Sequence, residues 1–152
     1  MRKLLPLFVA LMLAGTTATA DDEYYMELMK MDVRARKMEL VDEFMNLSSA
    51  QAKKFWPVYK KYQRELSKLN EKELLLIKKY AENVDRMTQD VAQEIAHDAF
   101  ELDIARGYLK KKYYRQFAFA TDAITAARFF QIENQLGLLI ELQIAAVLPL
   151  ME

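Results

Sequence analysis

The chain has a single histidine, His97, and two carboxylates lie where they could share a metal ion with it. Glu94 precedes His97 by one helical turn and Glu101 follows it by one turn, so a helix would bring all three side chains to one face. Glu-x-x-His is the spacing used in di-iron helical bundles, but those sites need a second copy and further carboxylates. The sequence therefore favours a surface ion pair at His97, and the alternative is a zinc site that pools residues of two chains.

Methionines near the N-terminus offer a second chemistry. Met26, Met29 and Met31 supply thioether sulfurs, which are ligands that copper(I) prefers. The same flexible side chains also fill cores and occur at surfaces that bind many partners. We expect core packing for most of them, and Met26 and Met29 are the two that we predict to contact a partner if the segment is exposed.

The sequence predicts no enzyme. Nucleophilic catalysis needs Ser, Thr or Cys beside a base, whereas the chain has no Cys and no Ser near His97. Acidic residues alternate with Lys and Arg over most of the chain, which is typical of solvated helix surfaces. We therefore expect no catalytic residues and no cofactor.

Residues 1–20 have the features of a cleaved secretory signal peptide. Arg2 and Lys3 precede an apolar run from Leu4 to Ala14, and Ala18-Thr19-Ala20 fits the small-x-small cleavage rule. The apolar run is too short to span a bilayer. We therefore expect export to the periplasm and a mature chain of residues 21–152.

The mature chain has the size of one domain, and its charge excludes some partners. Basic and acidic residues number 22 each in the full chain, so no basic excess points to nucleic acid. The chain has no Cys, so an exported protein of this sequence is held together by packing and not by disulfides.

The scarcity of Gly and Pro predicts four long amphipathic helices joined by short loops. We expect helices at 22–45, at 49–83, from Thr88 to about 117, and from a start within 118–122 to about 147. Such helices predict an all-α, elongated, antiparallel assembly. Gly107 lies inside the third helix, where it either weakens the helix or allows another helix to approach closely.

The second helix has the clearest local signals. Ser48 and Gln51 form a capping box at its start. Thr88 caps the next helix through its side chain, without the returning bond of a capping box. Pro57 lies inside the second helix and is expected to kink it. Apolar and aromatic residues recur every three or four positions and predict a buried seam. These are Phe55, Tyr59, Tyr62, Leu66, Leu69, Leu76 and Tyr80.

The C-terminal stretch 136–151 is apolar on most sides, and its only charged residue is Glu141. A helix of this kind is normally buried on most sides. It is either the central core helix of the monomer, a homodimer interface, or a surface that contacts a membrane or a client. Glu141 and Gln143 argue against a transmembrane span.

An aromatic and basic segment at the start of the second helix is a further candidate for partner binding. Trp56 lies off the seam, where it either faces a partner or packs against the first helix. Lys60 follows one turn later and places a charge beside it.

The stretch Leu47-Ser48-Ser49-Ala50-Gln51 resembles the Leu-Thr-x-x-Gln signature of the Spy and CpxP group of periplasmic proteins. Ser replaces Thr and caps equally well. The second expected copy is Met87-Thr88-Gln89-Asp90-Val91, where Val91 stands in place of Gln. The resemblance implies an all-helical homodimer. It also implies either a chaperone that works without ATP on unfolded or envelope proteins, or an accessory of a stress sensor. Some members bind zinc.

Overall fold

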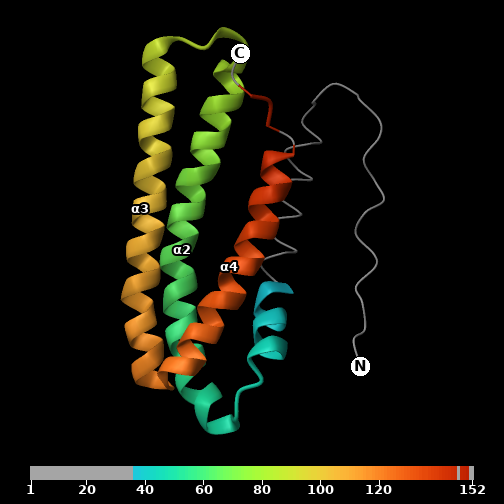
Figure 1. The fold of residues 1–152 in the computed structure, drawn as a ribbon, viewed down its shortest axis with the longest axis vertical. Helices are drawn as coiled ribbons and strands as arrows, with labels where there is room; N and C mark the ends of the chain where they lie inside the picture. Colours follow the sequence, from blue (N-terminus) through green and yellow to red (C-terminus); the bar gives the residue numbers. More distant parts are fainter. Residues whose placement is uncertain (1–35, 147, 151–152) are drawn as a thin grey trace, which may run out of the picture. The chain divides into compact units, whose positions relative to one another are not determined.

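A computed structural model describes residues 36–146 and 148–150, and their regular secondary structure is entirely helical (Figure 1). A helix at 36–45 is followed by α2 (Ser49–Asn83), the short 3-10 helix η1 (Val84–Arg86), α3 (Gln89–Ala120) and α4 (Ala123–Ala145). The prediction of an all-α fold is therefore confirmed. The predicted signal peptide 1–20, Met26, Met29 and Met31 lie outside the described residues, and the helices considered below belong to a compact unit that begins at Lys37.

α2 begins and ends at the predicted residues. Two hydrogen bonds between Ser48 and Gln51 fix its start. The Gln51 amide N–H donates to the Ser48 hydroxyl at 3.3 Å, and the Gln51 side-chain oxygen accepts from the Ser48 amide at 3.1 Å. The predicted capping box is confirmed. The helix runs through Pro57 without an interruption in its helical assignment, so the kink at Pro57 stays a prediction.

The caps of α3 and α4 explain where these helices begin. Thr88 accepts from the Val91 amide at 3.3 Å, and the apolar Val91 side chain cannot return a bond, so only half of a capping box forms. Asp122 accepts from the Thr125 amide at 2.8 Å and starts α4. α3 reaches Ala120, beyond the predicted end near 117, because the Thr121 amide bonds to the Phe117 carbonyl at 2.8 Å.

Side-chain pairs fix the directions of the helices. Glu65 of α2 binds Lys112 of α3, and Glu73 binds Arg106 at 2.5 Å, so α2 and α3 are antiparallel. Glu73 lies between Leu69 and Leu76, where the spacing of the seam would place an apolar residue, and this ion pair accounts for the polar residue there. Lys110 of α3 donates to Asn134 of α4 at 2.9 Å. α4 therefore runs antiparallel to α3 and in the same general direction as α2 (Figure 1).

Aromatic side chains fill the space between α2 and α4. Among the described residues, no Cα atom of α2 lies within 8 Å of one in α4. The ring of Phe55 on α2 reaches across this space. Its centroid lies 4.9 Å from that of Phe117 on α3 and 5.3 Å from that of Phe129 on α4, and the centroids of Phe117 and Phe129 are 4.5 Å apart. Contacts of this kind contribute beyond the area that they bury. We call Phe55, Tyr62, Phe117 and Phe129 the aromatic core.

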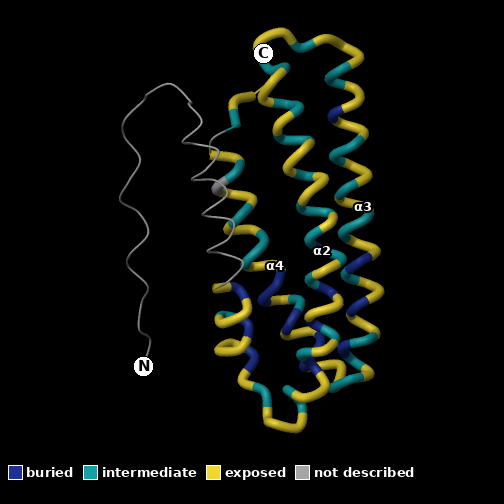
Figure 2. The backbone as a smooth tube through the Cα atoms, turned by 180° about the vertical axis from the view of Figure 1, so that it is seen from behind, coloured by how far each residue is buried: buried dark blue, intermediate teal, exposed yellow. Residues whose placement is uncertain are grey.

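The aromatic core lies toward one end of the helices, as the distribution of buried residues in Figure 2 shows. On α2 the last buried residue is Leu66, and on α4 it is Glu133. Val41 and Met45 of the helix at 36–45 complete the core at this end. The predicted seam is therefore buried only in its first half, because the later seam residues Leu76 and Tyr80 remain partly exposed.

One ion pair is enclosed in this end of the unit. Lys37 donates to the Glu133 carboxylate at 2.7 Å, and the Tyr62 hydroxyl donates to the same oxygen at 3.1 Å. Burial, and then the negative charge of Glu133, raise the pKa of Tyr62 far above its usual range, so it remains a donor. The three side chains join the helix at 36–45, α2 and α4. Removal of one partner from a buried pair is strongly destabilising because the other charge stays buried.

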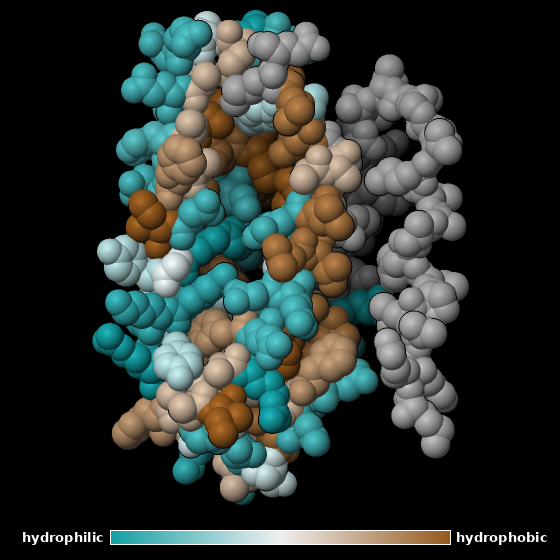
Figure 3. All heavy atoms as spheres, in the orientation of Figure 1, coloured by the Kyte–Doolittle hydropathy of each residue, from teal (hydrophilic) through white to brown (hydrophobic). Residues whose placement is uncertain are grey.

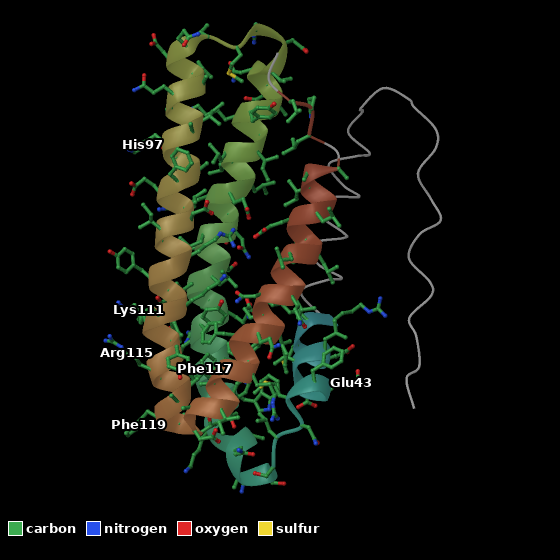
Figure 4. All side chains as sticks on the ribbon, viewed as in Figure 1. Glu43, His97, Lys111, Arg115, Phe117 and Phe119 are labelled. Carbon is green, nitrogen blue, oxygen red and sulfur yellow. The ribbon has the colours of Figure 1, made fainter. Side chains whose placement is uncertain are left out.

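Phe117 and Phe119 offer a matched pair that tests the aromatic core. Phe117 is fully buried, whereas Phe119, two residues later on α3, is 94% exposed and points away from the core (Figure 4). Phe117→Ala is expected to lower the free energy of unfolding by about 3–5 kcal/mol, since it leaves a cavity among the rings. Phe119→Ala is expected to change it by less than about 0.5 kcal/mol. Urea unfolding followed by circular dichroism measures both, and equal effects would contradict the assigned core.

Candidate functional site

Three leucines on the C-terminal half of α4 form an exposed apolar surface. Leu138, Leu139 and Leu142 are 63%, 60% and 68% exposed, and Glu141 is the one charged residue among them. Figure 3 shows hydrophobic side chains gathered along this helix. We call these three residues the leucine face. Among the described residues, burial on α4 ends at Glu133 and these leucines are exposed, so this part of the structure does not support the interpretation of the stretch as the central core helix of the monomer.

The remaining interpretations of the leucine face are a second copy, a client or a membrane surface. Exposed apolar patches of this kind mark sites of interaction when several apolar side chains lie together. None of the helices that the structure describes has both the length and the apolar run that crossing a membrane requires.

The starts of α2 and α4 are joined at the opposite end of the unit. The Gln51 side-chain amide donates to the Asp122 carboxylate at 3.3 Å and lies 3.4 Å from the Thr125 hydroxyl oxygen. The Thr125 hydroxyl in turn donates to Asp122 at 2.7 Å. Gln51 therefore serves in two caps, one on each helix. Through these contacts, the Leu47 to Gln51 stretch connects the start of α2 to the start of α4.

The sequence indicated Thr88 as the second copy of the motif at Ser48, whereas the helix cap that contacts Gln51 in the structure is Asp122. Thr88 starts α3 at the far end of α2, so it lies away from Ser48 (Figure 1). The missed signal was Asp-x-x-Thr at the start of an apolar run, which is an N-terminal signature like that at Ser48. The hydrogen bond from the Thr125 hydroxyl is the main cause that holds the pKa of Asp122 below its usual value.

The two described residues that the sequence assigned to partner binding differ in environment. The ring of Trp56 meets Phe55 and Tyr59 edge-on, with centroids at 5.1 Å and 5.2 Å, and packs against the core. Trp56 is therefore a core contact and not a free side chain. Lys60 is exposed on α2, consistent with contact to a partner but without a feature that singles it out.

The three proposed metal ligands do not converge. Glu94 binds Lys79 of α2, and the His97 ring nitrogen lies 3.6 Å from the Asp98 carboxylate instead of Glu94 or Glu101. The His97 side chain is 71% exposed, and Figure 4 shows it directed away from the other helices. Within 36–146 and 148–150, no three His, Asp or Glu side chains are grouped so that they could hold a metal ion. The described residues show no ion pair between His97 and Glu94 or Glu101, and the contact with Asp98 is ionic only when the imidazole is protonated.

Comparisons of the chain with models of protein families, with curated proteins and with solved structures found no match.

The shared cap at Asp122 predicts an acid-sensitive contribution to stability. Since the folded state lowers the pKa of Asp122, its contribution is complete above the unfolded pKa and is lost as the pH falls through the lower, folded pKa. Asp122→Asn keeps the capping oxygen but removes this titration. The unfolding free energy of the variant, measured from pH 2 to pH 6, is expected to depend less on pH than that of the unsubstituted protein. Parallel profiles would contradict a native role for the carboxylate.

Proposed function

We propose that this chain is a periplasmic, non-enzymatic binding protein of the chaperone-like type, which holds apolar stretches of unfolded or envelope proteins against its leucine face. The observation that carries the proposal is the exposure of Leu138, Leu139 and Leu142 on one half of α4. The signal-peptide pattern predicted at 1–20 supports the periplasmic location. Membership of the Spy and CpxP group is part of the proposal, and its support is the Leu47-Ser48-Gln51 match.

The leucine face has the chemistry of a general apolar binding surface. Leucine side chains adapt to many apolar partners, and a surface without a deep, polar-lined pocket does not select one small molecule. Glu141 is the single charged residue within the face. The face therefore has little attraction for a strongly charged ligand. A surface of this type suits weak, general binding of extended apolar segments. The chain needs no ATP for such binding.

Suppression of aggregation by leucine-face variants tests the proposal. The unsubstituted protein is expected to reduce light scattering from a chemically unfolded model protein after dilution. Leu138→Ser combined with Leu142→Ser is expected to lose most of this effect, because the apolar area is replaced by hydroxyls. Ile124→Ser is the matched control, since Ile124 is 74% exposed on the other end of the same helix. Circular dichroism confirms that all variants keep their helices.

Two outcomes would overturn the proposal. Suppression that is equal in the double variant and the unsubstituted protein would remove the leucine face from the binding site. Absence of suppression by the unsubstituted protein would exclude the chaperone role. Saturable binding to a single envelope protein, found by crosslinking in intact periplasm, would then indicate a sensor accessory instead.

A further inference from the structure

Charge is distributed unequally along the described helices. The segments 49–64, 104–120 and 123–132 contain eleven basic residues and no acidic residue. These are Lys53, Lys54, Lys60, Lys61, Arg64, Arg106, Lys110, Lys111, Lys112, Arg115 and Arg128. The stretch 65–103, by contrast, holds ten acidic and five basic residues. Because α2 and α4 begin where α3 ends, the basic segments gather toward one end of the unit (Figure 1).

The outer side of α3 carries exposed aromatic rings among these cations. Tyr108 and Phe119 are 70% and 94% exposed, and Lys111 and Arg115 lie between them in the sequence. Helical periodicity places the four side chains within about a quarter turn of one another. Figure 4 shows Lys111, Arg115 and Phe119 directed away from the other helices, whereas Glu43 lies on the opposite side of the unit. We call Tyr108, Lys111, Arg115 and Phe119 the basic-aromatic face.

Some cations on α3 serve contacts within the chain, and others do not. Arg106 and Lys112 bind Glu73 and Glu65 of α2. In the part of the chain that the structure describes, Lys111 and Arg115 take part in none of the ion pairs. The positive charge of the basic-aromatic face is therefore available to a partner outside the described residues.

An open hollow lies between the same side chains. Its volume is about 260 Å³, and its lining consists of Tyr108, Lys111, Lys112 and Arg115. Ammonium and guanidinium groups form charge-assisted hydrogen bonds with phosphate oxygens, and a phenol hydroxyl is a further donor. The hollow therefore suits the phosphate group of a larger ligand that also contacts the neighbouring Phe119 ring.

We propose that the basic-aromatic face docks on the surface of an anionic phospholipid bilayer, with a lipid phosphate at the hollow and the Phe119 ring in the headgroup layer. A bilayer offers phosphates directly above an apolar layer, so it complements cations and exposed rings that lie together. Tyrosine is enriched at this level of membranes because its ring is apolar and its hydroxyl is polar. A purely acidic protein surface would pair with Lys111 and Arg115 but would leave Phe119 in water. This docking does not depend on the proposed chaperone role.

The charge distribution and the position of α4 give the bound chain an orientation. The anionic surface attracts the basic end of the unit and repels the acidic stretch 65–103. α4 lies on the side of α3 opposite to Lys111 and Arg115 (Figure 4). The leucine face therefore stays accessible from the aqueous phase when the basic-aromatic face contacts lipid.

Flotation with phospholipid vesicles tests the docking. The protein is expected to bind vesicles containing phosphatidylglycerol roughly tenfold or more tightly than vesicles of phosphatidylcholine alone. Lys111→Gln with Arg115→Gln is expected to weaken binding to the anionic vesicles about 25-fold, because each cation near such a surface contributes about fivefold. Lys78→Gln with Arg86→Gln is the matched control and should bind normally, since both residues are exposed toward the other end of the unit.

A second variant separates the aromatic contribution from the charges. Phe119→Ser removes apolar area and leaves the cations in place, so it is expected to weaken binding to both kinds of vesicle about fivefold. The preference for phosphatidylglycerol should remain. Circular dichroism checks that each variant keeps its helices.

Several results would overturn the proposal. Equal binding of the unsubstituted protein to both kinds of vesicle, or binding to neither, would exclude recognition of anionic lipid. Unchanged binding of the variant with Lys111→Gln and Arg115→Gln would remove the basic-aromatic face from the contact. Release from vesicles by millimolar inorganic phosphate would indicate a site for free phosphate instead. Retention on polyglutamate without vesicle binding would indicate an acidic protein partner. None of these readouts involves an unfolded client, so failure here leaves the chaperone test separate.

Discussion

Phe55, Phe117 and Phe129 meet in one cluster, and the arrangement of the described helices depends on it. The backbones of α2 and α4 do not approach each other closely, so the rings span the distance that smaller side chains would leave empty. These rings occur toward one end of the unit, and burial on α4 stops at Glu133. The leucine face is exposed because the same helix continues past the core that anchors it.

Polar contacts reinforce the end of the unit that holds the aromatic rings. Glu133 accepts from Lys37 and Tyr62, and Gln51 joins the caps of α2 and α4. The Glu133 contacts hold the helices against one another, and the Gln51 contacts hold the starts of α2 and α4 together. Neither set of contacts creates a cavity for a ligand. The stretch at Ser48 and Gln51 therefore positions the helices on which the proposed binding surfaces lie, and it is not itself the binding site.

Local signals in the sequence predicted the helices well and the tertiary contacts less well. The bounds of α2 were predicted because Ser48 and Gln51 act within one turn and few residues break the helix. The bond between Gln51 and Asp122 joins positions 71 residues apart, so local spacing carries no trace of it. The extent of the buried seam was also missed, since burial depends on which neighbouring helices cover it. Trp56 lies off the seam and nevertheless packs edge-on against Phe55 and Tyr59 of its own helix.

Amide hydrogen exchange, followed residue by residue with and without an unfolded client, tests the central claim that one end of the unit is the anchor and the leucine face is the binding surface. The account predicts slow exchange around Phe55, Phe117 and Phe129 under both conditions, because these amides open only with the core. It predicts faster exchange at 136–145 in the free protein and clear protection there when client is present. Unchanged exchange at 136–145 in the presence of bound client, with protection elsewhere, would contradict the account.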